Sequence, residues 1–353
     1  MTKWTRTIAL GVAATSLLGV TTACSSSSKQ ANSSGHGGAG TSASSSATAA
    51  AATTVKIGIF AGDGSAPWEI ADQQGFFAKQ GIKAEFVNFT SGPAIVAALL
   101  SGSVDVGEGT SGAVYQVVRQ SPQVTVLNDF SQTNYTVIVV NSSKATSSVS
   151  AGYPANVKSL KGLKIGVPAL GSQLQNLITG VLQNAGLSAS DVTFIATGGL
   201  STIIAALKNN RIDAQPVTWA TVALLKKAGL SITPVIDVAQ PGNAGPGFSK
   251  GLFTFDLAST SFASSNSGLL GKYCTAMRDA VNWAKSPANL TSVSGIVAKL
   301  DGVTAAGIQP IWPKVTPTYT TSLTESAWSS QPSWVTGGGT IPAYSKSVTS
   351  CAP

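Results

Sequence analysis

The sequence predicts an α/β protein of two similar lobes joined by a double-crossing hinge. The main indication is an internal repeat, in which residues 81–105 are echoed by residues 186–213. Both copies read as strand, Gly-rich turn, helix and strand, and both place an Ala-Leu pair at the same distance before an aspartate. A β-rich run precedes each copy, at 55–60 and at 163–167. Each copy is therefore expected to form a right-handed βαβ unit.

The segments between the two units set the lobe boundaries. Residues 54–138 and about 255–353 are expected to form the first lobe, and residues 142–250 the second. The chain then passes between the lobes twice, and two crossings make a hinge.

Helices are predicted from the spacing of apolar residues and from Gly and Pro residues that mark helix ends and starts. Residues 67–77 read as a helix with a proline in its first turn, where the missing N–H costs little. Apolar stripes at helical spacing predict further helices over 174–182 and 269–284. Core packing is a sufficient explanation for these stripes.

The N-terminus has the order of an export signal. Lys3 and Arg6 precede an uncharged run over 8–20, which is followed by small residues and Cys24. The run has about 13 residues, whereas spanning a bilayer takes roughly 20. Residues 1–23 are therefore predicted to be a signal peptide.

The cysteine at the cleavage point makes this signal similar to the bacterial lipobox. The motif is Val20-Thr-Thr-Ala-Cys24, with Thr21 where leucine is commonest. Lipidation of Cys24 is predicted, which would hold the exported protein on the outer face of the membrane. The alternative is plain secretion with an incidental cysteine.

Residues 24–53 are predicted to be a flexible tether. They are almost wholly Ser, Ala, Gly and Thr, so they have no side chains to form a core that would offset their ordering entropy. A tether of this length spans roughly 30 Å root-mean-square. The folded lobes would stay close to the membrane.

The cysteine count is odd, which calls for an explanation in an exported protein. If Cys24 carries lipid, Cys274 and Cys351 remain as a pair, and export places them where disulfides persist. A disulfide between them is predicted. Two separate thiols are the alternative, because sequence alone does not place them within bonding distance.

Composition excludes several classes of function. His36 is the single histidine and lies in the tether, so a catalytic triad has no imidazole and a zinc or copper site has no ligand set. The net charge is +8, but the basic residues are scattered, with Lys226-Lys227 the only adjacent pair. Nucleic-acid binding is not expected, and neither a cofactor nor a metal is.

Several motifs together resemble one family of binding proteins, the solute-binding lipoproteins of ABC importers. This is the group that takes up sulfonates, taurine, nitrate and the thiamin pyrimidine precursor. The resemblance covers roughly residues 55–237, and the motifs that carry it are Ala66-Pro-Trp-Glu-Ile-Ala71, Gly75-Phe-Phe77, Gly81-Ile82, Ser91-Gly-Pro93, Ala98-Leu-Leu-Ser-Gly102, Val104-Asp-Val-Gly107, Lys158-Ser-Leu-Lys-Gly-Leu-Lys-Ile-Gly166 and Gly171-Ser172.

The resemblance implies a type II periplasmic-binding-protein fold and a ligand held between the lobes. It also implies a membrane permease as partner and binding without catalysis, and we expect a monomer. A ligand sensor for a membrane signalling protein is one alternative. An exported enzyme on the same fold is another, but it requires reactive histidines.

Four loops after strands are the candidate ligand site, since helix N-termini meet ligands there. Each has a structural alternative: Asp63 as a turn residue, Trp68 and Trp219 as core, Ser91 as a helix cap. The candidate residues are Asp63, Ser65, Trp68, Ser91, Gly92, Glu108, Gly109, Thr110, Ser111, Ser172, Gln173, Thr218 and Trp219.

The side chains of these loops bear on the chemistry of the solute. They contain no Arg or Lys, so a simple anion would depend on amides and hydroxyls. Asp63 and Glu108 favour a solute with a positive or hydrogen-bond-donating part. A zwitterion, an amine-bearing heterocycle or an uncharged organic solute fits at least as well as a simple sulfonate.

Overall fold

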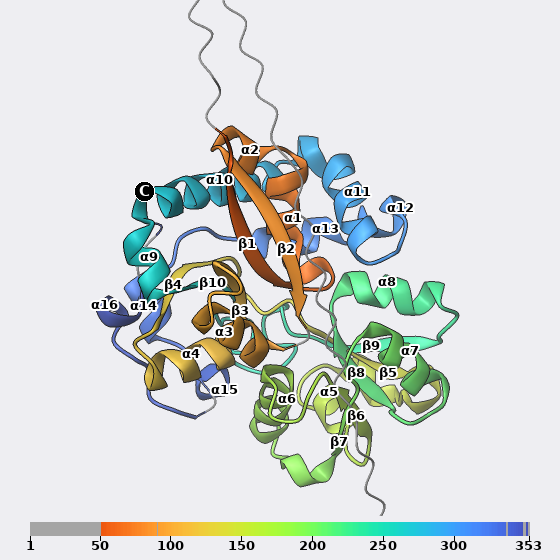
Figure 1. The fold of residues 1–353 in the computed structure, drawn as a ribbon. Helices are drawn as coiled ribbons and strands as arrows, with labels where there is room; N and C mark the ends of the chain where they lie inside the picture. Colours follow the sequence, from red (N-terminus) through yellow and green to blue (C-terminus); the bar gives the residue numbers. More distant parts are fainter. Residues whose placement is uncertain (1–50, 90, 337, 349–350, 352–353) are drawn as a thin grey trace, which may run out of the picture. The chain divides into compact units, whose positions relative to one another are not determined.

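Two five-stranded sheets organise the part of the chain that the computed structural model describes, which is residues 51–89, 91–336, 338–348 and 351. The predicted signal peptide, Cys24, His36 and nearly all of the predicted tether lie outside the described residues. Both sheets belong to one unit, Ala50–Pro353. Figure 1 shows each sheet with its own helices.

The two sheets share one strand plan. In sheet order, the first contains β2 (Ile82–Phe89), β1 (Thr53–Phe60), β3 (Val106–Thr110), β10 (Thr254–Ser259) and β4 (Val124–Asp129). The second contains β7 (Thr193–Ala196), β6 (Lys164–Val167), β8 (Ala214–Val217), β5 (Val137–Asn141) and β9 (Ile232–Asp237).

Strand direction confirms the internal repeat. Strand β1 is parallel to β2 and β3, and β6 is parallel to β7 and β8, so both copies form the same unit. The fourth strand of each sheet is antiparallel: β10 pairs with β3, and β5 pairs with β8. Because β5 follows β4 directly and β10 follows β9, the chain passes from one sheet to the other twice.

We call each sheet with its helices a lobe. Helices of the first lobe that precede the crossing are the 3-10 turn η1 (Asp63–Ser65), α1 (Ala66–Gln73), α2 (Phe76–Lys79), α3 (Gly92–Leu100) and α4 (Ser111–Gln120). The second lobe carries η2 (Ser142–Lys144), η3 (Ser147–Ala151), α5 (Ala155–Lys158), α6 (Gln173–Asn184), η4 (Ala189–Asp191), α7 (Leu200–Lys208) and α8 (Trp219–Lys227).

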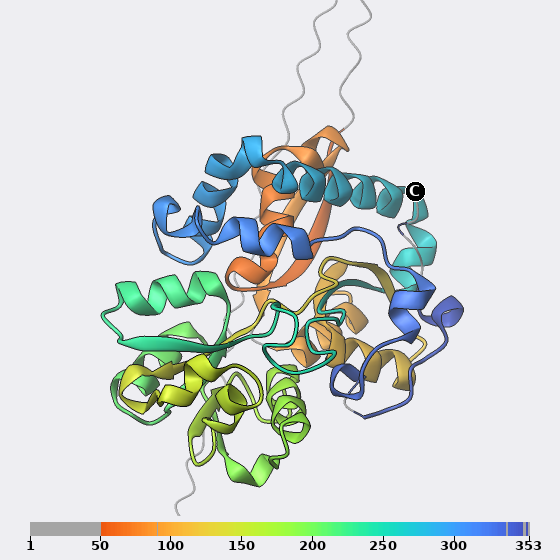
Figure 2. The ribbon, with the colours of Figure 1, turned by 180° about the vertical axis from the view of Figure 1, so that it is seen from behind.

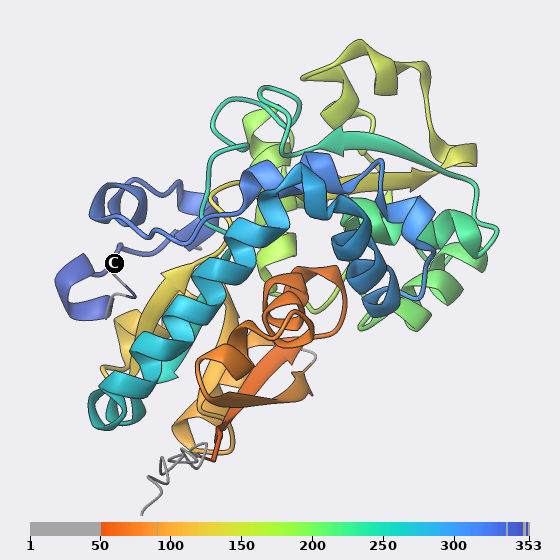
Figure 3. The ribbon, with the colours of Figure 1, turned by 90° about the horizontal axis from the view of Figure 1, so that it is seen from above.

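The chain after β10 is helical. Its elements are α9 (Thr260–Ser265), α10 (Ser267–Lys285), η5 (Pro287–Asn289), α11 (Leu290–Leu300), α12 (Ala305–Ile308), α13 (Trp312–Val315), η6 (Thr316–Thr318), α14 (Glu325–Ser329), α15 (Ser333–Thr336) and α16 (Tyr344–Ser347). From behind, α10, α11 and α13 lie over one face of the first sheet (Figure 2). Figure 3 shows α10 running beside α1 and α2.

One predicted helix is interrupted. The segment 67–77 divides into α1 and α2 because Gly75 has a φ of 73°, a left-handed conformation that ends a helix. The predicted helices over 174–182 and 269–284 are confirmed as α6 and α10, and their apolar stripes are buried in the core.

The apolar core has three parts. One lies between the first sheet, α1, α10 and α11, and another lies within the second lobe around α7 and α8. A third extends from α3 and α4 of the first lobe to α6 of the second, and Trp334 of α15 stacks on Phe248 within it at 5.7 Å between ring centroids. Within the described residues, helices fall short of the length and apolar character that a membrane span requires.

Candidate functional site

The candidate site is built from the ends of parallel strands. Strands β1 and β3 of the first lobe end where η1 and α4 begin, and β6 and β8 of the second lobe end before α6 and α8. Helix N-termini present free N–H groups and a positive dipole end. Hydrogen bonds join these loops across the two lobes. We call the place where the loops after β1 and β3 meet those after β6 and β8 the junction.

The first cross-lobe pair is Asp63 with Thr218. The Thr218 hydroxyl, at the N-cap of α8, donates to Asp63 Oδ1 at 2.9 Å. Thr218 Oγ1 also accepts from the backbone N–H of Thr221 at 3.2 Å, which caps α8. Thr218 therefore both starts its helix and reaches the other lobe.

The second cross-lobe pair is Ser111 with Gln173. Gln173 Nε2, at the start of α6, donates to the Ser111 hydroxyl at the start of α4. Gln173 is buried, and its Oε1 has no hydrogen-bond partner among the described residues. All four residues of the two pairs were candidates from the sequence.

Further contacts run along α8. Lys314 Nζ lies 4.7 Å from the centre of the Trp219 ring, and Trp219 Nε1 donates to Asp237 at 3.1 Å. Lys227, at the end of α8, donates to the carbonyl of Gly302 at 2.8 Å. Helix α8 therefore meets the first lobe at both of its ends.

Glu108 lies buried beside the η1 turn. Its Oε2 accepts from the backbone N–H of Phe60 at 2.9 Å and lies 2.6 Å from the Ser65 hydroxyl. The Asp63 N–H, in the same turn, donates to Asp301 Oδ1 at 3.0 Å. Asp63, Glu108 and Asp301 are 7%, 3% and 6% exposed, so three carboxyl groups are buried around one turn.

Burial changes the protonation of these groups. It raises the pKa of Glu108 from 4.5 to about 7, although hydrogen bonds from Ser65 and Phe60 oppose the change. Burial also raises the pKa of Asp63, and burial together with the neighbouring Asp63 raises that of Asp301. The cluster therefore holds protons near neutral pH when no cation is bound.

The free energy of unfolding is expected to fall as pH rises from 4.5 through 7. Folded Glu108 binds its proton more tightly than the unfolded chain does, so the stability gained below pH 4.5 is lost through this window. The loss is on the order of 3 kcal/mol for Glu108, at 1.36 kcal/mol per pH unit between the two pKa values. Asp63 and Asp301 add a change of the same sign.

Urea unfolding at pH 5 and pH 8 measures this change. Glu108→Gln should flatten the pH dependence, whereas Glu85→Gln, at an exposed ion pair with Lys83, should leave it unaltered. A protein that becomes more stable between pH 5 and pH 8 would contradict the assignment.

Trp68 occupies a place that the core alternative explains. It is fully buried, its indole N–H lies 3.0 Å from Asp256 Oδ1 and 2.8 Å from the Tyr273 hydroxyl, and its ring packs edge-on against Phe130. Gly109 also has a packing role, because a Cβ there would lie 2.8 Å from Leu257. Ser172 caps α6 through the N–H of Gln175.

Two helices of the first lobe begin without a side-chain capping hydrogen bond. Ser91 and Thr110 are the N-cap residues of α3 and α4, and neither side chain makes a capping hydrogen bond. Ser91 is therefore at the N-cap, as its structural alternative requires, but its hydroxyl does not cap the helix. A Cβ on Gly92 would lie 3.8 Å from Thr110 Oγ1, so the two starts are adjacent.

Asp301, Tyr319 and Tyr135 were not candidates from the sequence. Asp301 follows α11 and Tyr319 follows η6, both in the region where no family motif was found. A Cβ on Gly64 would lie 3.7 Å from the Tyr135 hydroxyl and 3.6 Å from Glu108 Oε1. The sequence signal for Asp301 was an aspartate before a glycine at the end of an apolar helix. Ordinary turns have the same pattern, so it does not indicate a binding site.

The described residues hold no group of three or more His, Cys, Asp or Glu placed to bind a metal ion. A surface pocket of about 240 Å³ lies at the end of α10 and is lined by residues that include Lys285, Leu290 and Trp312. Carboxyl groups and cross-lobe contacts are at the junction, so we place the candidate site there.

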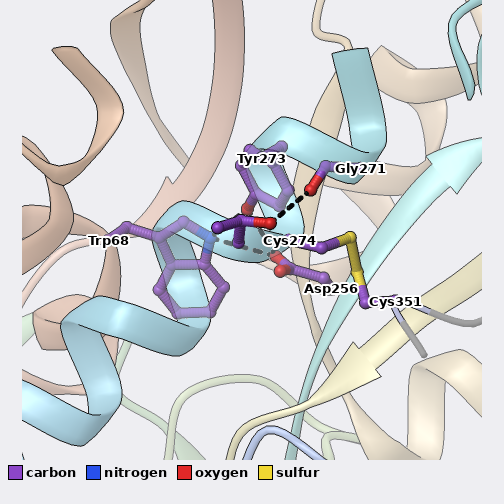
Figure 4. The surroundings of a disulfide bond; sticks show 7 residues. Trp68, Asp256, Gly271, Tyr273, Cys274 and Cys351 are labelled. Carbon is purple, nitrogen blue, oxygen red and sulfur yellow. Dashed lines mark hydrogen bonds between the residues drawn. A yellow bond between two sulfur atoms is a disulfide. The ribbon is translucent and has the colours of Figure 1, made fainter. Parts of the chain in front are cut away.

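Cys274 and Cys351 meet in the first lobe. Their Cα atoms are 5.3 Å apart, and Figure 4 shows the pair joined beside Tyr273 and Asp256. Cys274 lies on α10, and the N–H of Cys351 donates to the carbonyl of Leu127 on β4 at 3.1 Å. Cys351 thus lies between β4 and α10.

Residues 48–298 match the profile of the NMT1-like family. The chain belongs to the NMT1-like family. Two relatives of the chain are named as binding proteins of Brucella abortus and Brucella suis. They are 28% identical to it over 164 residues, which are 46% of this chain and 47% of each relative. The match thus spans about half the length of these relatives.

Solved structures share the fold of this NMT1-like protein. The alkanesulfonate-binding protein of Xanthomonas axonopodis pv. citri has a TM-score of 0.63 at 20% identity, over 79% of this chain and 90% of that one. The periplasmic nitrate-binding protein of Synechocystis has a TM-score of 0.57 at 17% identity, over 72% and 69%. These likenesses confirm the two-lobed α/β fold. The family match supports the resemblance found in the sequence, and the solved structures are named as binding proteins, not as enzymes.

Proposed function

We propose that the protein captures a small organic solute between its lobes and delivers it to an ABC importer. The observation that carries the proposal is the pairing of helix starts across the junction, Asp63 with Thr218 and Ser111 with Gln173. A solute held there takes up donors and acceptors from both lobes, so its affinity favours the closed form over an open one. The permease then receives the closed form.

The proposal includes export and a lipid anchor. A signal peptide over 1–23, lipid on Cys24 and a tether over 24–53 would keep a monomeric receptor on the outer face of the cell membrane, within reach of the permease. Solved relatives named as periplasmic support an extracytoplasmic location. The proposed function includes three classes of solute: sulfonates, amine-bearing solutes and heterocycles.

Thermal-shift screening of the purified protein against these three classes tests the proposal. At a concentration one hundred times its Kd, a solute stabilises the folded form by about 2.7 kcal/mol, so a shift of several degrees in Tm is expected. Thr218→Val combined with Gln173→Ala should reduce the shift, while Gln116→Ala, on the exposed side of α4, should preserve it. A screen without a stabilising solute would count against solute capture.

A ligand sensor is the alternative, and partner identity separates the two. If the protein serves an importer, cross-linking it in intact membranes should recover a permease and its ATPase. Recovery of a membrane kinase in their place would favour the sensor. Catalysis is not proposed, because the single histidine lies in the predicted tether.

A further inference from the structure

Three carboxyl groups surround one turn at the junction. Asp63 belongs to the η1 turn, and the turn lies between Asp301 and Glu108. The Asp63 N–H donates to Asp301, and the Ser65 hydroxyl lies against Glu108. Their residues come from three separate parts of the first lobe: the loop after β1, strand β3 and the end of α11. Each is more than nine-tenths buried.

No basic side chain neutralises this cluster among the described residues. The ion pairs among the described residues lie elsewhere: they join Lys83 to Glu85, Lys144 to Asp213 and Lys161 to Asp191. Lys227 and Lys285 donate to backbone carbonyls, those of Gly302 and Tyr319, at 2.8 and 3.0 Å. Burying ionised carboxylates without a counter-charge costs several kcal/mol per ion, so in the absence of a cation these carboxyl groups hold protons instead.

A second observation points to a missing partner at the same place. The Tyr319 hydroxyl has no hydrogen-bond partner among the described residues, although Tyr319 is 3% exposed. Burial raises the pKa of the Tyr319 hydroxyl, and Tyr135 and the three carboxyl groups add to the rise. Asp301 Oδ2 is also buried without a partner. Buried polar atoms are normally hydrogen-bonded.

We propose that the captured solute carries a protonated nitrogen, which binds between Asp63, Glu108 and Asp301 with Tyr319 as a further partner. This inference rests on the proposed function, because it names the solute class for the same junction. An ammonium group has three N–H donors and an amidinium has four, and both match acceptors that are spread around a turn. A metal ion requires ligands that converge on one point, and the described residues contain no such group.

The solute would supply the positive charge that the protein lacks. Charge-assisted hydrogen bonds to carboxylates are about twice as strong as neutral ones. Because these carboxyl groups hold protons near neutral pH when no cation is present, binding a cation should release protons to the solvent. Heats of binding measured in two buffers of different ionisation enthalpy report that release.

Matched pairs of probes test the proposal in calorimetric titrations of the purified protein. The pairs are taurine with isethionate, 2-phenylethylamine with 2-phenylethanol, and benzamidine with benzamide, in which one member carries a cationic nitrogen and the other does not. In at least one pair, the cationic member is expected to bind tenfold or more tightly and with proton release. Asp301→Asn should remove that preference, and Tyr319→Phe should weaken the cation three- to tenfold while its ring packing is kept.

Asp279→Asn on the exposed side of α10 is the matched control and should change neither affinity. Circular dichroism checks that Asp301→Asn folds, and Tyr319→Phe carries the test if it does not. Equal affinity within every pair, or tighter binding of the neutral or anionic member, overturns the cationic solute and leaves solute capture standing. Absence of binding by every probe and by every compound of the thermal-shift screen overturns both.

Discussion

Replacing Cys24 by serine is expected to move the protein from the membrane fraction to the soluble fraction. A two-chain lipid anchor is stable, whereas a single acyl chain gives only reversible binding. The uncharged run over 8–20 is too short to replace it as a span, and the described residues contain no helix suited to span a membrane. Fractionation of cells that express each form measures the change.

Incorporation of a labelled fatty acid gives this prediction a second readout. The label should be present in the unaltered protein and absent from Cys24→Ser, while Cys274→Ser should keep it. A serine variant that remains fully membrane-bound, or that keeps its label, would exclude the lipid anchor.

Removing the bond between Cys274 and Cys351 is expected to lower the free energy of unfolding by 2–5 kcal/mol. We propose that this disulfide forms in the exported protein. The cysteines are 77 residues apart, and closing a loop of that size restricts the unfolded chain by roughly 4 kcal/mol in the chain-entropy account. The bond also holds the C-terminal segment against β4, where Val348 forms a bridge with Val126.

Urea unfolding of the protein and of the double variant Cys274→Ala/Cys351→Ala measures the effect. Cys24 is unchanged in both, so a lipid anchor does not differ between them. A reducing agent should destabilise the unaltered protein and leave the double variant unchanged. Equal stability of the two forms without reductant would show that the thiols are separate.

The sequence predicted the lobes because their signal is periodic and repeated. The repeated segments 81–105 and 186–213 contain β2 and β7, and each lies in the chain between two strands that pair with each other, β1 with β3 and β6 with β8. Local conformation was harder to predict. Gly75 interrupts an apolar stripe whose spacing is otherwise helical, and a left-handed φ is not visible in such spacing.

Site residues could be predicted where they follow a strand of the repeat. Asp63, Ser111, Gln173 and Thr218 all do so, and the fold brings them together in pairs. Asp301 could not be predicted, since its contact with Asp63 spans 238 residues and lies outside any motif. Trp68 was a sequence candidate that the structure places in the core. From sequence alone, an aromatic residue near a loop fits a core position and a ligand contact equally well, and only its burial separates the two.

A crystal structure of the protein with the most stabilising solute from the screen tests the central claim most directly. We predict solute density at the junction, in contact with Asp63 or Ser111 of the first lobe and with Gln173 or Thr218 of the second. Density confined to one lobe, or in the surface pocket at the end of α10, would contradict capture between the lobes.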